Sequence, residues 1–447
     1  MDYKDDDDKS RNIDGIMTNR LETKYENLSS IFRLKGHDYQ KQFFHLYAHR
    51  LAEMTRLLTP LAQKKWGNKE PIKKLCELRG EQDVHCILIG TIFKHQAHKP
   101  SILRDISEEN QLAPQPPRQN YSDPEDKIVL EDELQRVRLQ GKLNGQLLAT
   151  GVVCAALGGT DSDGFFNVED ILFYESGPQK PLAPIKRSRL LVLASGLDQL
   201  QAHKFVEALN LFQYWLAGSL GNNKEAGSMV RLIVAGNSVR ASAMAHVPTL
   251  QVARTQANAN DTVQAVSQLD QWFASWARSL PVDIMPGPYD PANFMLPQQP
   301  FHKCMFPQAA QLATFQAVTN PYSCRLDEAL VVGTSGQNVS DLLRSTSLDS
   351  ALEALRCTLT WGHVAPTAPD TLACYPYIES DPFILRECPH VYYAGNCESF
   401  ATELHEGSEG KRTRLVCVPS FSKTQSVAVV DLDTLDCRMV NFSVDAE

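Results

Sequence analysis

The sequence predicts a multidomain protein of mixed α+β and α/β class, in which a small β-barrel precedes a two-sheet sandwich. Three observations support this fold. Residues 73–176 contain four or five strand-like segments, strands and helices alternate from residue 190 onward, and the chain ends in further strands. With 447 residues the chain is also too long for one ordinary hydrophobic core, so we expect two or three domains.

The composition narrows the protein class before any motif is considered. Residues 1–16 are an affinity tag and its linker, and the tag contributes −3 to the formal net charge of −9, which leaves −6. This mild acidity gives no overall nucleic-acid signal. The 11 cysteines are scattered without a CxxC pair, as in reduced proteins of the cytosol or nucleus. No apolar run approaches the ~20 residues that a bilayer requires, so we expect no membrane contact.

Residues 17–70 are predicted to form an N-terminal segment and a helix that packs on the barrel. Residues 17–36 are polar, and we expect them to be frayed. From Asp38 onward, apolar side chains recur at helical spacing, and Gly67 can end the helix. The predicted core stripe consists of Phe43, Tyr47, Leu51, Met54 and Leu58.

Residues 71–180 are predicted to form the barrel. The strand-like segments are 84–93, 128–139, 147–157 and 164–173, and a proline-containing excursion around residues 114–117 interrupts them. Four or five short strands with one long excursion favour an OB-fold.

An OB-fold could bind single-stranded nucleic acid through exposed aromatic and basic side chains. Here the aromatic residues lie inside apolar runs, which favours core packing over a stacking surface. Acidic residues 131–133 also offset Arg136 and Arg138. The aromatic residues concerned are Phe93, Phe165, Phe166, Phe173 and Tyr174.

Residues 181–447 are predicted to form an α/β/β/α sandwich. Strands are expected at 190–194, 230–235, 282–285 and 390–394, with one helix along 205–220 and another from Asp261, as N-cap, to 279. Three C-terminal strands at 414–418, 426–432 and 437–442 are expected to form one antiparallel sheet. Functional sites in such folds lie at the carboxyl ends of strands.

Four of these strand ends stand where a calcineurin-like metallophosphoesterase would place its metal ligands. After the first strand, Gly196 and Asp198 occupy the positions of an Asp-x-His pair, and Asn237 occupies the position of the bridging aspartate after the second. An amide has no charge to offset two divalent cations and glycine offers no ligand, whereas two-metal hydrolysis requires a bridging carboxylate.

The other two strand ends are degraded in the same way. Tyr289 stands near the position of the histidine in a Gly-Asn-His motif, and Asn396 and Glu398 replace the two histidines of a Gly-His-x-His motif. Asp198, Asp290 and Glu398 are the remaining carboxylates, which could at most hold one Mg²⁺ weakly. The sequence therefore predicts a degenerate phosphoesterase-like domain with no catalytic residue, metal ligand or cofactor.

Several segments carry a resemblance to a known family. Two of them are Leu296-Pro-Gln-Gln-Pro300 and Pro366-Thr-Ala-Pro-Asp-Thr-Leu372. With the segments at 75–78, 100–104, 112–118, 130–136 and 333–341, they resemble the small regulatory (B) subunits of eukaryotic DNA polymerase delta, and the resemblance covers about residues 34–442. The N-terminal segment looks short for this family.

The resemblance implies a nuclear, non-catalytic scaffold in DNA replication and repair. Such subunits join the C-terminal metal-binding module of the polymerase catalytic subunit to a third accessory subunit. They are linked to the sliding clamp and to DNA only through the other subunits of the complex. Archaeal relatives keep the phosphoesterase residues and act as nucleases. Interface residues are not implied, although the aromatic- and proline-rich loops 294–306 and 375–383 are candidates.

Two alternatives remain open on the sequence alone. A metal-dependent phosphodiesterase or 3′-exonuclease would lose its activity on Asp290→Ala or Glu398→Ala. A stand-alone OB-fold binder of single-stranded DNA would show salt-dependent affinity for short oligonucleotides.

Overall fold

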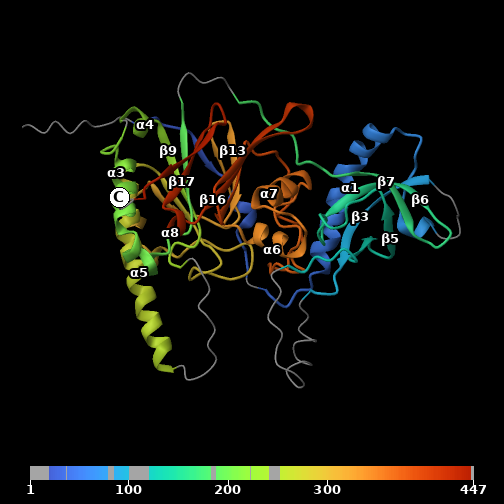
Figure 1. The fold of residues 1–447 in the computed structure, drawn as a ribbon, viewed down its shortest axis with the longest axis horizontal. Coiled ribbons are helices and arrows are strands. Elements are labelled where there is room, and N and C mark those ends of the chain that lie inside the picture. Colours follow the sequence, from blue (N-terminus) through green and yellow to red (C-terminus); the bar gives the residue numbers. More distant parts are fainter. Residues whose placement is uncertain are drawn as a thin grey trace, which may run out of the picture.

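The structure, a computed structural model, describes residues 20–36, 38–78, 85–99, 120–182, 188–221, 223–240 and 252–443. Within these ranges the chain forms three six-stranded sheets. One sheet is built from residues 72–172, and the other two stack beside it as a sandwich (Figure 1). The excursion around residues 114–117 lies outside the described residues.

The first sheet wraps onto itself. Strand β3 pairs antiparallel with both β4 and β6, β5 pairs parallel with β7, and the remaining β4–β5 and β6–β7 pairs complete a ring. Each of five strands therefore has two neighbours, while β2 adds to β3 at one side. The strands are β2 (Ile72–Lys73), β3 (His85–His95), β4 (Lys127–Glu131), β5 (Arg136–Gly141), β6 (Val153–Thr160) and β7 (Phe166–Leu172).

The single strand expected at 128–139 is two strands, β4 and β5, joined by a tight turn. The turn forms because the Asp132 carboxylate accepts hydrogen bonds from the backbone N–H groups of Leu134 and Gln135, both at 2.8 Å. This local capping competes with the extended ladder that the alternation of residues suggested.

Helix α1 (Phe44–Trp66) packs on the barrel and ends at Gly67, which has a φ of 80°. Its buried face differs from the predicted stripe. Met54 and Leu58 are buried as expected, but Tyr47 and Leu51 are only half-buried and Phe43 is 39% exposed. The buried positions recur at steps of four along the helix: Leu46, Arg50, Met54, Leu58 and Ala62.

The expectation of a frayed N-terminal segment is wrong for the described residues 20–36. Strand β1 (Tyr25–Asn27) pairs antiparallel with β12 at the edge of a sandwich sheet. Phe32 is buried and stacks on Phe383, with ring centroids 6.4 Å apart. A polar segment gives little periodic signal when backbone pairing supplies much of its stabilisation.

The sandwich consists of two sheets with a buried apolar core between them. One sheet has the order β1-β12-β13-β14-β16-β15 and the other β11-β10-β9-β8-β17-β18. The strands are β8 (Leu190–Ala194), β9 (Met229–Ala235), β10 (Val282–Met285), β11 (Phe315–Ala317), β12 (Tyr322–Leu326), β13 (Ala329–Thr334), β14 (Val391–Cys397), β15 (Ala401–Glu406), β16 (Arg412–Pro419), β17 (Ser426–Asp431) and β18 (Cys437–Asn441).

Helices cover both outer faces of the sandwich (Figure 1). Helices α3 and α5 pack on the sheet that contains β8 and β9, and α6 and α7 pack on the other sheet, between the sandwich and the barrel. The remaining helical bounds are α3 (Val206–Ala217), α4 (Asn223–Ser228), α5 (Val252–Ser279), α6 (Gln337–Ser345), α7 (Ala351–Thr360) and α8 (Phe421–Thr424). The layers therefore follow the order α/β/β/α.

Two local predictions in the sandwich are wrong. Asp261 is not an N-cap, because α5 begins at Val252 and places Asp261 in its interior. The three C-terminal strands do not share one sheet, because the short helix α8 carries the chain from β16 in one sheet to β17 in the other. Strands β17 and β18 do pair antiparallel, as expected.

All eleven cysteines are free thiols in the structure. In the part of the chain that the structure describes, none of the helices combines the length and apolarity needed to cross a membrane.

Candidate functional site at the carboxyl ends of the sandwich strands

The loops that follow β8 and β9 and the last residues of β14 meet at one end of the sandwich and bond to one another. The Gly196 N–H donates to the Gly236 carbonyl at 2.9 Å, and the Asp198 N–H donates to the Asn237 carbonyl at 3.2 Å. The turns are sharp, with φ values of 62° at Gly196, 79° at Gly236 and 55° at Asn237. Such backbone favours glycine and asparagine, which explains these residue types at the strand ends.

Asn396 joins the two sheets through its side chain. Its Nδ2 donates to the Ala235 carbonyl at 3.0 Å and to the Ser335 carbonyl at 2.9 Å, while its backbone N–H donates to Ser195 Oγ at 2.8 Å. Ala235 ends β9 in one sheet and Ser335 follows β13 in the other. Asn396 therefore ties the two sheets together at this end of the sandwich.

Asn237 and Asp290 also bond to the backbone of the neighbouring loops. Asn237 Oδ1 accepts from the Tyr289 N–H at 3.2 Å, and the Asp290 carboxylate accepts from Val239 N–H at 2.8 Å and Gly287 N–H at 2.9 Å. Burial raises the pKa of Asp290 to about 6, against the opposing effect of these backbone donors. This carboxyl group therefore braces a loop.

Little room remains between these loops. A Cβ atom added at Gly196 would lie 2.6 Å from Ser420 Oγ and 2.8 Å from Asn396 Oδ1. A Cβ atom at Gly287 would lie 2.4 Å from Asn237 Oδ1. Both distances are far inside van der Waals contact, so neighbouring side chains leave no space for a side chain at Gly196 or Gly287.

Most of the predicted site positions meet here. The loops bring Gly196, Asp198, Asn237, Tyr289 and Asn396 into one cluster, whereas Glu398 is solvent-exposed. Among the residues that the structure describes, no three His, Cys, Asp or Glu side chains are grouped so that they could hold a metal ion.

Sequence reasoning missed a second polar layer behind these positions. Asn320 Nδ2 donates to Gln298 Oε1 and to Ser335 Oγ, both at 2.8 Å. Gln298 in turn donates to the Gly287 carbonyl at 3.0 Å. Gln298 lies in the family-like segment 296–300 and Ser335 in the family-like segment 333–341. A structural role shared by these two segments was the one sequence signal that could have pointed to this layer.

The aromatic side chains of the barrel divide into two groups. Phe166 and Tyr174 are buried, as predicted, while Phe93, Phe165 and Phe173 are half-buried. The Arg136 guanidinium lies 5.2 Å from the centroid of Phe93, and Arg138 lies 5.1 Å from that of Phe165. Arg136 also pairs with Glu131 at 2.8 Å, so an acidic group neighbours this surface.

The two loops proposed as interface candidates contribute mainly to the core. Phe301, Phe306, Tyr375 and Phe383 are buried, and Phe294 alone among the phenylalanines of these loops is strongly exposed, at 73%. Most of the aromatic side chains in these loops therefore serve to pack the core.

Comparison with known proteins identifies the family. A family model described as "DNA polymerase delta subunit OB-fold domain" matches residues 42–171, and a second model, which describes the B subunits of DNA polymerases alpha and epsilon, matches residues 191–402. The N-terminal domain is thus an OB-fold domain, as the strand pattern predicted.

Full-length relatives carry the same name. The DNA polymerase delta small subunit of Oryza sativa subsp. japonica is 38% identical over 433 residues, covering 95% of this chain and 98% of that protein. Its counterpart in Arabidopsis thaliana is 36% identical, covering 95% and 96%, and that of Saccharomyces cerevisiae is 29% identical, covering 94% and 93%. The chain belongs to the family of DNA polymerase delta small subunits.

Proposed function

We propose that this chain is a non-catalytic accessory subunit that works in the nucleus. It joins the polymerase catalytic subunit, through that subunit's C-terminal metal-binding module, to a third accessory subunit. Contact with the sliding clamp is indirect, and contact with DNA is made through the complex. Family membership supports the coarser part of this proposal, namely that the chain is an accessory subunit of DNA polymerase delta.

The non-catalytic part of the proposal rests on Asn396. Its side-chain amide is engaged by two backbone carbonyls, one from each sheet of the sandwich. Hydrolysis by two metals needs open coordination sites and charged ligands at this place. We therefore propose that the sandwich is a phosphoesterase-like fold in its layers. At the positions of the metal ligands it carries side chains that hold the loops and sheets together.

A bridging role also requires a rigid body, because a flexible subunit would not fix the relative position of its partners. Buried contacts between barrel and sandwich support this requirement. Lys94 of β3 is buried, lies 3.5 Å from the Asp126 carboxylate and donates to the Ser345 carbonyl of α6 at 3.3 Å. Both domains can thus present surfaces in a fixed orientation.

The N-terminal tag allows a direct test. We expect that capture of the tagged chain from dividing cells recovers the catalytic subunit and a third subunit in stoichiometric amounts, together with primer-extension activity. The untagged chain serves as the control for adsorption. Recovery of the chain alone, without polymerase activity, would contradict the assembly role.

A second assay addresses the absence of catalysis. The purified chain is incubated with Mn²⁺ and either bis(p-nitrophenyl) phosphate or a labelled oligonucleotide. We expect no hydrolysis above that of the Asp290→Ala and Glu398→Ala variants. Metal-dependent turnover that either substitution abolishes would show that the chain is an enzyme after all.

A further inference from the structure

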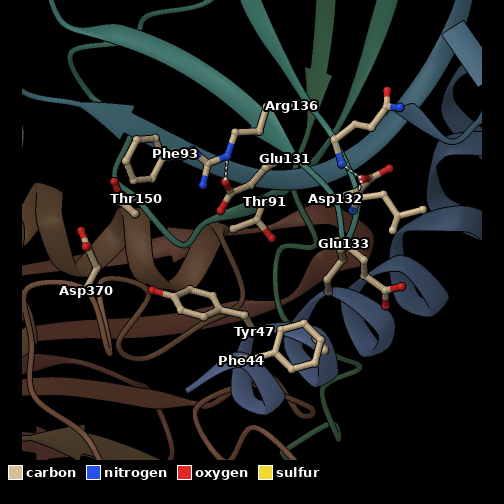
Figure 2. A pocket seen from close by; sticks show the side chains of 14 residues that line it. Phe44, Tyr47, Thr91, Phe93, Glu131, Asp132, Glu133, Arg136, Thr150 and Asp370 are labelled. Atoms are coloured by element: carbon tan, nitrogen blue, oxygen red, sulfur yellow. Dashed lines mark hydrogen bonds and ion pairs between the residues drawn. The ribbon is translucent and has the colours of Figure 1, made fainter. Parts of the chain in front are cut away.

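An acidic groove of about 700 Å³ lies between helix α1 and the barrel. Figure 2 shows Phe44 and Tyr47 of α1 on one side, and Glu131, Glu133 and Arg136 of the β4–β5 hairpin on the other. None of the residues that line this groove belongs to the strand-end cluster described above.

The helix wall of the groove is an apolar stripe that the core covers only in part, since Tyr47 and Leu51 are half-buried. Phe44, Tyr47, Ala48 and Leu51 line the groove at helical spacing, and Phe44 is 62% exposed. The core-facing position between them is taken by the buried Arg50. Tyr47 and Leu51 of the predicted stripe, together with Phe44 and Ala48, therefore face the groove, where a partner could cover them.

The opposite rim presents an apolar side chain on a fixed turn. Leu134 lies at the tip of the β4–β5 turn and is 78% exposed. The Asp132 carboxylate holds that turn, since it accepts from the N–H groups of Leu134 and Gln135 and also from the Leu75 N–H at 3.2 Å. A partner that covers Leu134 would gain its apolar area, and the fixed position of the turn lowers the entropy cost of binding.

The charges on the lining select the kind of partner. Four carboxylates, those of Glu131, Asp132, Glu133 and Asp370, face one guanidinium, that of Arg136. Lys99 pairs with Asp370 at 2.5 Å, which leaves a net charge of −2. This surplus disfavours nucleic acid and favours Lys or Arg side chains.

We propose that this groove is the docking site for a segment of a partner subunit in which large apolar side chains are flanked by Lys or Arg. The apolar side chains fill the space between Tyr47, Leu51 and Leu134, and the basic ones reach the carboxylates of the rim. The inference rests on the proposed function, because it assigns the groove to a subunit of the same complex.

Site-specific photo-crosslinking tests the occupant. The photoreactive residue p-benzoylphenylalanine replaces Leu134, and in a matched chain it replaces Val263, which is 69% exposed on α5 at the far side of the molecule (Figure 1). After irradiation, the complex is captured through the tag and the crosslinked peptide is sequenced. We expect the Leu134 position to crosslink a co-purifying subunit at a peptide that combines large apolar residues with Lys or Arg.

Two substitutions test the energetics. Leu134→Asp should lower recovery of that one subunit about tenfold or more, as removal of an interface anchor does. Glu133→Lys should lower it in a manner that weakens at high salt. Val263→Asp and Glu207→Lys are the matched controls, since these residues are exposed on α5 and α3. All four positions are on the surface, so thermal unfolding should stay close to that of the unsubstituted chain.

The outcomes separate the groove from the wider proposal. Loss of one subunit in both groove variants, with the controls unchanged and the expected crosslink, supports the inference. Crosslinks to residues 100–119 of the same chain or to a second copy overturn it, and so does full recovery of every subunit by both groove variants. If the unsubstituted chain recovers no polymerase subunit, the proposed function fails and the groove inference falls with it.

Discussion

Arg50 of helix α1 and Asp381 of the sandwich form a buried ion pair, with Nε and Oδ2 2.6 Å apart. The same guanidinium donates to the carbonyls of Pro366 at 2.9 Å, Ala368 at 2.7 Å and Gly151 at 3.3 Å. Gly151 belongs to the barrel, and the other carbonyls belong to the sandwich. One arginine therefore joins the N-terminal helix, the barrel and the sandwich into a single body.

Replacement of Arg50 should uncouple these parts. Arg50→Ala leaves the Asp381 charge buried without its guanidinium, so we expect the free energy of unfolding to fall by about 3–5 kcal/mol. Urea denaturation followed by circular dichroism measures the loss. Arg56→Ala, at an exposed position of the same helix, should change stability by less than about 0.5 kcal/mol. Equal midpoints for the two variants would contradict the role of Arg50.

The imidazole of His363 should make stability fall on mild acidification. His363 is buried, its Nδ1 accepts from the Ala365 N–H at 3.2 Å, and its Nε2 lies 2.9 Å from Asp381 Oδ2. Burial, assisted by the Arg50 charge, lowers the pKa of His363. Burial alone would raise the pKa of Asp381, but Arg50 and His363 outweigh it and hold that pKa well below its usual range.

The sign of the pH dependence follows from these shifts. Below about pH 6.5 the unfolded chain binds more protons at His363 than the folded chain does, so the free energy of unfolding falls as pH falls. From pH 7.5 to 5.5 this residue contributes a loss of at most about 1.4 kcal/mol. Urea denaturation at both pH values should show that His363→Gln removes this part of the dependence, whereas the exposed His49→Gln leaves it intact. An unchanged dependence in His363→Gln would refute the assignment.

The features that sequence predicts well are those set by neighbouring residues. Strand ends at Asn237 and Asn396 could be located because buried strands read as apolar runs and the following turn needs residues that tolerate positive φ. Arg50 could not be assigned to the core, because its partners Gly151 and Asp381 lie 101 and 331 residues away in the chain. A charged residue in a helix carries no sign of burial until those partners are placed.

Strand β1 was missed by the sequence prediction for a related reason. Its stabilisation comes from backbone pairing with β12 and from one side chain, Tyr25, whose ring centroid lies 3.7 Å from the Arg231 guanidinium. Neither contact leaves a periodic pattern in residues 20–36. The strand-end cluster could likewise be predicted only in part from the sequence, because Gln298 and Asn320 come from loops that are distant in the chain.

Tyr25 should anchor the N-terminal segment. Its hydroxyl lies 3.0 Å from that of Tyr322, and the Arg231 beneath its ring pairs with Asp283 at 2.6 Å. Tyr25→Ala removes both the ring and the hydroxyl, so we expect a loss of about 2–3 kcal/mol and faster proteolysis near β1. Tyr25→Phe keeps the ring over the cation and should cost about 1 kcal/mol. Equal losses in the two variants would show that the stack on Arg231 contributes nothing.

Gly196 tests how tightly packing closes the strand-end cluster. Its φ of 62° and the 2.6 Å approach of a Cβ atom to Ser420 Oγ both oppose any side chain there. Gly164 has a φ of 79° with nothing within 4 Å of a Cβ atom, so Gly164→Ala isolates the backbone strain, about 1–2 kcal/mol. Gly196→Ala should cost about 1–3 kcal/mol more, because Ser420 and Asn396 must also move.

Gly196→Asp extends the same argument to chemistry. The aspartate would place a carboxylate at the end of β8, but the loops leave it no space and Asn396 stays bound to two carbonyls. We therefore expect destabilisation in urea denaturation and no hydrolysis of bis(p-nitrophenyl) phosphate with Mn²⁺. Gly196→Ala provides the reference for both measurements. A Gly196→Asp chain that is as stable as Gly164→Ala and gains Mn²⁺-dependent turnover would mean that the loops can open and that packing does not close the site.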